Sequence, residues 1–138
     1  MAPLRCWGVN DESGQGRSQT VRCAAGAPAP VDARQFLEAA ELLDAPDVVA
    51  TCAIHAATAA ADAITGHALG ERSSDGNHVS AVDLLRQVDT SLATALKRAL
   101  DRKTQASYES VDLSAAEATS CVRWARQLLA AAEARFEV

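Results

Sequence analysis

The segment from residue 45 to residue 70 constrains the fold of this chain more than any other part of it. Ten of its 26 residues are alanine, and Asp47 and Asp62 are its only formally charged side chains. Alanine is the best helix former, and its small side chain allows neighbouring helices to approach closely. The segment therefore predicts one long central helix that ends at Gly70, since glycine is the usual residue just after a helix.

Large apolar side chains are scarce, which limits the stability of any bundle built around this helix. The 138 residues include two Trp, two Phe, one Tyr and one Met, although 49% of the residues are hydrophobic. A buried Leu-sized or Phe-sized side chain contributes about 1.5–3 kcal/mol, and alanine contributes much less. The length suits a single domain of marginal stability, so we expect the protein to self-associate.

Residues 1–30 differ in composition from the remainder of the chain. They contain four of the seven glycines and three of the four prolines, and they lack the apolar run of a secretory signal. This composition predicts a poorly ordered tail over residues 1–30, followed by a helical bundle domain over residues 31–138.

Charge and cysteine spacing indicate a cytoplasmic protein that does not enter the membrane. The longest stretch between charged residues in the alanine-rich segment is 14 residues and includes His55. A membrane-spanning helix needs roughly 20 apolar residues. The four cysteines show no paired spacing, which favours a reduced compartment. The net charge of −5 argues against general electrostatic attraction to nucleic acid but is compatible with a local basic surface.

Helical periodicity and capping signals divide the domain into helices joined by short connections. We expect helices at about residues 32–43, 46–69, 79–88, 92–109 and 115–136, and no segment alternates as a strand would. The last helix begins with a capping box, Ser114-Ala-Ala-Glu117. The predicted fold class is all-α, an antiparallel bundle of four to five helices.

The two helices nearest the tail carry the most specific structural expectations. In the first, Asp32 is expected to cap the N-terminus, and Val31 to pack on Phe36, which is buried together with Leu37, Ala40 and Leu43. In the central helix, small residues at helical spacing predict a close-packing interface, either inside one bundle or between two copies. Its members are Val49, Ala53, Ala56, Ala60 and Ala63.

Several segments in a fixed order carry a resemblance to a known family over roughly residues 32–136. They are Ile54-His55-Ala56-Ala57 in the central helix, a glycine-containing loop, His78 followed by Leu84-Leu85, Leu100-Asp101-Arg102-Lys103 with Ala106 and Tyr108, and Glu117-Ala118 with Leu128-Leu129.

This order resembles the HEPN family, which comprises small helical bundles of prokaryotic toxin–antitoxin and defence systems. The resemblance implies a dimer that works with a partner protein encoded nearby. It also implies contact with RNA or a nucleotide through Arg98, Arg102, Lys103 and Tyr108. Active members of the family are metal-independent ribonucleases that use an arginine followed, after four to six residues, by a histidine. Here the matching segment has no histidine, so the resemblance favours a binding protein.

Two alternatives stay open beside that hypothesis. Arg72 and His78, separated by five residues, have the spacing of the ribonuclease motif but lie in the loop after the central helix. A metal-independent endoribonuclease could use this pair, with the arginine stabilising phosphate charge and the imidazole exchanging protons. The second alternative is a purely structural interaction module.

Neither a metal nor another cofactor is expected. Cys52 and His55 share a helical face at a spacing that suits zinc, but no second pair with ligand spacing accompanies them. Trp124 lies between Arg123 and Arg126 in the last helix, where it either stacks on a base or packs at the edge of the bundle.

Overall fold

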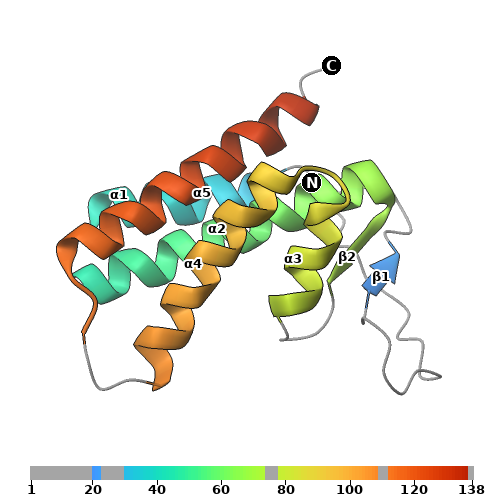
Figure 1. Cartoon of the computed structure of the whole chain (residues 1–138). Coiled ribbons are helices and arrows are strands. Elements are labelled where there is room, and N and C mark those ends of the chain that lie inside the picture. The colour runs from blue at the N-terminus through green and yellow to red at the C-terminus, as the bar shows by residue number, and fades with distance from the viewer. Residues whose placement is uncertain (1–19, 23–29, 74–77, 109–111, 137–138) are drawn as a thin grey trace.

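A computed structural model describes residues 20–22, 30–73, 78–108 and 112–136 of the chain. Over these ranges it confirms the predicted all-α bundle (Figure 1). The helices are α1 (Val31–Leu42), α2 (Pro46–Leu69), α3 (His78–Arg86), α4 (Thr90–Tyr108) and α5 (Ala115–Phe136).

The central helix is α2, which packs against all four other helices. Eleven of its 24 residues are buried, and most of these are alanines. The small side chains allow α1 and α5 to lie close along it, while α3 and α4 pack on its other side (Figure 1). Gly70 ends the helix with a left-handed φ of 70°, as predicted from the sequence.

The predicted alanine interface lies inside a single chain. Ala53, Ala56 and Ala60 are fully buried and Ala63 is 2% exposed, while Val49 is half-buried against the core. Residues enclosed in this way cannot contact a second copy unless the bundle opens. Of the two expectations, packing inside one bundle is therefore correct, and an interface between copies at these residues is wrong.

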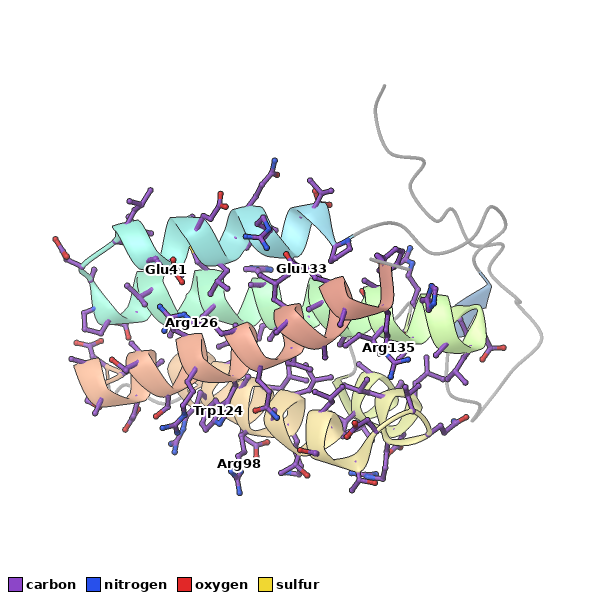
Figure 2. The ribbon with its side chains drawn as sticks, turned by 90° about the horizontal axis from the view of Figure 1, so that it is seen from above. Glu41, Arg98, Trp124, Arg126, Glu133 and Arg135 are labelled. Atoms are coloured by element: carbon purple, nitrogen blue, oxygen red, sulfur yellow. The ribbon has the colours of Figure 1, made fainter. Side chains whose placement is uncertain are left out.

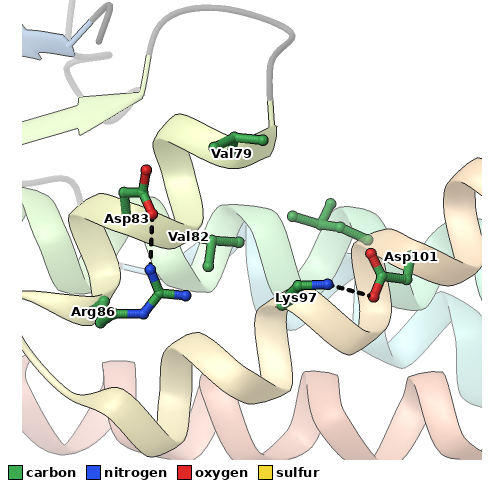
Figure 3. A pocket seen from close by; sticks show the side chains of 7 residues that line it. Val79, Val82, Asp83, Arg86, Lys97 and Asp101 are labelled. Atoms are coloured by element: carbon green, nitrogen blue, oxygen red, sulfur yellow. Dashed lines mark hydrogen bonds and ion pairs between the residues drawn. The ribbon is translucent and has the colours of Figure 1, made fainter.

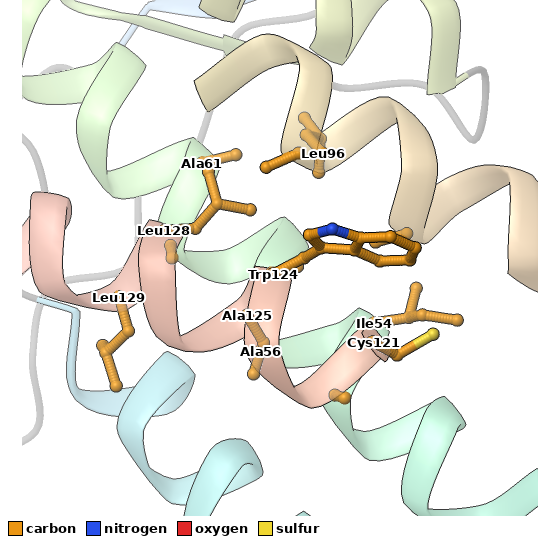
Figure 4. Packing of buried hydrophobic residues seen from close by; sticks show 14 of the residues in the cluster. Ile54, Ala56, Ala61, Leu96, Cys121, Trp124, Ala125, Leu128 and Leu129 are labelled. Atoms are coloured by element: carbon orange, nitrogen blue, oxygen red, sulfur yellow. The ribbon is translucent and has the colours of Figure 1, made fainter. Parts of the chain in front are cut away.

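The few large side chains fill the space that alanines leave between helices. Trp124 is only 9% exposed, and Figure 4 shows its indole ring among core residues that include Ile54, Leu96 and Cys121. Burying such a ring supplies much of the apolar area that a bundle rich in alanine lacks. Trp124 therefore packs in the core and is not available to stack on a base.

Helix termini agree with the sequence in some places and differ in others. The backbone N–H of Glu117 donates to Ser114 Oγ at 3.1 Å, so the predicted cap of α5 is confirmed. Asp89 Oδ1 accepts from the backbone N–H of Leu92 at 3.1 Å at the start of α4. In α1 the expected Asp32 cap is wrong, because the helix begins at Val31 after Pro30 and has no side-chain cap.

Two short strands form a pair that the sequence pattern did not predict. Thr20–Arg22 (β1) pairs antiparallel with Glu71–Ser73 (β2), with Val21 opposite Arg72. Three-residue strands are too short to show alternation, so they carry no periodic signal. The remainder of the segment expected to be a poorly ordered tail, residues 1–19 and 23–29, lies outside the described residues.

Within the described part of the chain, α2 is the one helix long and apolar enough to cross a membrane. Its most apolar window is 56% buried inside the bundle, as is usual for a core helix.

Candidate binding surfaces

The predicted catalytic pair lies where α2 gives way to α3. Arg72 is half-buried in the middle of β2, and His78 is the first residue of α3. The side chain of His78 and residues 74–77 lie outside the described residues. The structure thus places both residues at the end of the bundle where α2 is followed by β2 and α3.

Arg72 has a charged neighbour in Asp62, which was not predicted as a site residue. Burial raises the pKa of Asp62 from 3.8 to about 7, and the Arg72 guanidinium opposes that rise. Asp62 lies on α2 two turns before its end, and the segment folds back through Gly70 to bring β2 beside it. Its one sequence signal is that it is the single charged residue in the apolar stretch from Val48 to Leu69.

The predicted RNA-contacting residues are spread along α4. Arg98 and Lys103 are exposed and Arg102 is half-buried, while the side chain of Tyr108 lies outside the described residues. Figure 2 shows Arg98 directed away from the bundle. Arg98 and Lys103 form no ion pair within the described part of the chain, whereas the neighbouring Lys97 is bonded to Asp101 at 2.9 Å.

Arg102 lies at the contact between α4 and α5. Burial raises the pKa of the Cys121 thiol to about 11, the nearby Arg102 charge opposes the rise, and Glu117 adds to it. The Oε2 atom of Glu117 is buried and has no hydrogen-bond partner among the residues that the structure describes. The guanidinium therefore sits beside the helix interface, and Arg98, one turn earlier, extends the same edge of α4 outward.

On α5, Arg123 is a further exposed cation. Arg126, one turn further along the helix, donates to Glu41 Oε1 of α1 at 3.0 Å. Arg34 of α1 makes a second bridge to Glu133 of α5. These two bridges join α1 to α5, so we assign Arg126 a structural role.

A groove of about 270 Å³ separates α3 from α4 (Figure 3). Val79, Val82 and Leu100 line the groove. Each helix also carries an ion pair at the groove: Arg86 with Asp83 at 2.8 Å on α3, and Lys97 with Asp101 on α4. The two cations are balanced by the two carboxylates, so the groove has no net preference for a charged ligand. The sequence analysis did not single it out, because its lining comes from two helices whose packing sequence alone does not show.

The outer side of the α1–α2 hairpin exposes apolar side chains. Phe36 is 41% exposed and stacks on His55 of α2, with ring centroids 5.2 Å apart and planes 24° from parallel. The prediction that Phe36 is buried is therefore wrong, as is that for Leu43, which is 42% exposed, whereas Leu37 and Ala40 are buried as predicted. Val31, which was predicted to pack on Phe36, is 48% exposed.

His55 and Cys52 have ordinary packing roles in this arrangement. Cys52 is half-buried, and the His55 ring lies on Phe36. No cluster of three or more His, Cys, Asp or Glu side chains suited to a metal ion occurs among the residues that the structure describes.

Comparison with known proteins gives no relative: no family model, no curated protein and no solved structure matches the chain. Inferences about function therefore depend on the chain's own surfaces.

Proposed function

We propose that this protein is a HEPN-like helical-bundle binding protein that works with a partner protein in a toxin–antitoxin or defence pair and contacts RNA or a nucleotide. The observation that carries the RNA contact is the pair of exposed cations on α4, Arg98 and Lys103, neither of which has an ion-pair partner within the described residues. Uncompensated cations on a helix surface suit the phosphate backbone of RNA.

The charge pattern supports a local contact rather than a general one. The chain has a net charge of −5, so long-range attraction to nucleic acid is absent. Three other cations of α3 to α5 are paired with carboxylates: Arg86 with Asp83, Lys97 with Asp101 and Arg126 with Glu41. Binding is then expected to depend on a few residues along one edge of α4.

The test is binding of a short fluorescent single-stranded RNA, measured by anisotropy at two salt concentrations. Arg98→Glu and Lys103→Glu should each weaken binding roughly three- to tenfold and reduce its salt dependence. Arg86→Glu is the matched control, because it makes the same charge change at an exposed site on α3. Equal losses in all three variants would show only a dependence on net charge and would contradict the proposal.

The second candidate function is a metal-independent endoribonuclease that uses Arg72 and His78. Asp62 favours it, since a carboxyl group with a pKa of about 7 beside an arginine can exchange protons near neutral pH. RNA incubated with the protein and with His78→Ala and Asp62→Asn decides between the candidates. Cleavage that His78→Ala abolishes supports the enzyme, and intact RNA with measurable binding supports the binding protein.

Homodimer formation, a cytoplasmic location and a partner encoded nearby complete the proposal. The small residues of α2 are enclosed, so a dimer has to use the outer surface of the bundle. Sedimentation of the purified protein tests the dimer, and co-purification with the product of the neighbouring gene tests the partner. For a purely structural module, charge reversal at Arg102 and Lys103 would leave function unchanged.

A further inference from the structure

The outer side of the α1–α2 hairpin presents a continuous apolar stripe, which we call the hairpin stripe. The Phe36–His55 stack fixes the register of the two antiparallel helices. Ala39 lies three residues after Phe36 on α1, and Cys52 lies three residues before His55 on α2. Because the helices are antiparallel, these two residues face each other, and both are half-buried. Val48 lies a further turn back along α2 and is 47% exposed. The hairpin stripe consists of Phe36, Ala39, Val48, Cys52 and His55.

The hairpin stripe faces away from the rest of the bundle. On α1, the residues that bridge to α5 are Arg34 and Glu41, and Leu37 and Ala40 face the core. Phe36 and Ala39 project from the remaining side, where α1 meets α2. Within the described part of the chain, no other helix covers this side.

The hairpin that carries the stripe is acidic. Residues 31–69 hold six acidic side chains and one basic side chain, Arg34, so their excess of five negative charges equals the net charge of the whole chain. Asp32 lies one turn before Phe36, and Asp44 lies at the opposite end of α1, next to the turn that leads to Val48. Both are exposed and form no ion pair with another described residue. An exposed carboxylate thus lies near each end of the apolar stripe, and Asp44 also lines a pocket that includes Arg126 of α5.

This arrangement disfavours a second copy of the chain as the occupant. A symmetric contact would bring two acidic hairpins together, and like charges repel across a desolvated interface. A head-to-tail contact with α4 of a second copy would supply cations. However, Leu92, Leu96 and Leu100 of α4 are buried and cannot contribute apolar surface to such a contact. The occupant has to supply both apolar and basic side chains.

We propose that the hairpin stripe binds a basic amphipathic helix of a partner protein. From Asp32 to Asp44 the stripe is about 18 Å long, which corresponds to about 12 residues of helix. A helix with apolar residues at positions i, i+3 or i+4, and i+7 would fill the space over Phe36, Ala39 and Val48, while lysine or arginine at its ends reaches the two carboxylates. The inference rests on the proposed function, because it names the surface and the chemistry of the partner proposed there.

Two synthetic peptides serve as probes. One is an amphipathic helix of about 18 residues with leucine on one face and lysine on the flanks, and the other has glutamate in place of lysine. Fluorescence anisotropy with the full-length protein should show binding of the lysine peptide and at least tenfold weaker binding of the glutamate peptide. In NMR spectra of labelled protein, the lysine peptide should shift the signals of Phe36, Val48 and His55.

Exposed-residue variants with matched controls locate the contact. Val48→Ser should weaken binding of the lysine peptide roughly tenfold. Leu42→Ser should leave this binding unchanged, because Leu42 is 84% exposed on α1 and lies outside the stripe. Asp44→Lys should weaken peptide binding several-fold, whereas Asp112→Lys should not change it, although Asp112 is also exposed. Circular dichroism establishes that each variant is folded, and the NMR shifts of the unmodified protein give a test that needs no variant.

Several results would overturn the proposal. They are equal affinity for the two peptides, no binding of either peptide, NMR shifts confined to α4, equal losses in Val48→Ser and Leu42→Ser, or a dimer in sedimentation that Val48→Ser dissociates. Arg98→Glu separates this inference from the RNA contact, since it should leave peptide binding unchanged. In the unmodified protein, peptide binding without RNA binding would refute the RNA contact alone, and RNA binding without peptide binding would refute the hairpin stripe alone.

Discussion

Enclosure determines how the two described cysteines react. Cys121 is fully buried, and burial raises the pKa of its thiol to about 11, whereas Cys52 is half-buried in the hairpin stripe. The thiolate is the reactive form, so both accessibility and ionisation protect Cys121. We expect iodoacetamide at pH 8 to modify Cys52 much faster than Cys121, measured by peptide mass spectrometry. Equal rates in the native protein would mean that α4 and α5 open readily.

Asp62 makes stability depend on pH. Its pKa is about 7 in the folded chain and 3.8 as an ordinary carboxyl group, so the folded chain binds this proton more tightly than the unfolded chain does. The contribution of Asp62 to the free energy of unfolding is therefore most favourable below about pH 4 and declines as the pH rises to about 7. Asp62→Asn should flatten this decline and raise the free energy of unfolding by about 1–3 kcal/mol at pH 8. Urea denaturation at pH 5 and pH 8 measures the effect, and a decline as steep in the variant as in the unmodified chain would contradict it.

At the scale of single residues, sequence periodicity predicted burial only where a side chain points at the centre of the core. Leu37 and Ala40 do so and were predicted correctly. Phe36 lies at the margin of the same face. It contacts α2 on one side, but no other described helix covers its other side, so it is less buried than the periodic pattern predicts. Asp62 shows the opposite case, since its enclosure depends on β2, which sequence did not reveal.

The close packing of α2 should be sensitive to side-chain size. Ala56 is fully buried, whereas Ala68 is exposed near the end of the same helix. Ala56→Leu inserts three carbon atoms into a filled interface and should lower the free energy of unfolding by about 1–3 kcal/mol or more. Ala68→Leu, with almost the same helix propensity change, should alter it by less than about 0.5 kcal/mol. Thermal and urea denaturation test the pair, and equal effects would show that size at this interface is not limiting.

At the scale of elements, the helices could be predicted and the strand pair could not. The capping box at Ser114 and the C-terminal glycine at Gly70 act locally, so their consequences are visible in sequence. The pairing of β1 with β2 joins segments about fifty residues apart, and nothing in three residues encodes that partner. Whether the alanines of α2 pack within one chain or between two was likewise open until the helices were placed.

For the whole molecule, the distribution of charge separates two surfaces. The α1–α2 hairpin holds the excess negative charge, and the edge of α4 holds exposed, uncompensated cations. We propose that these surfaces serve different partners, a basic helix and RNA. None of this could be predicted from the net charge of −5, because that figure averages the two surfaces.

The most direct test of binding as the protein's function is an NMR titration of the labelled full-length chain with short single-stranded RNA, followed by electrophoresis of the same RNA. The account predicts shifts concentrated at Arg98 and Lys103 on α4 and RNA that is recovered intact. Shifts concentrated at Arg72 and His78, together with cleaved RNA, would contradict it and identify the protein as a ribonuclease.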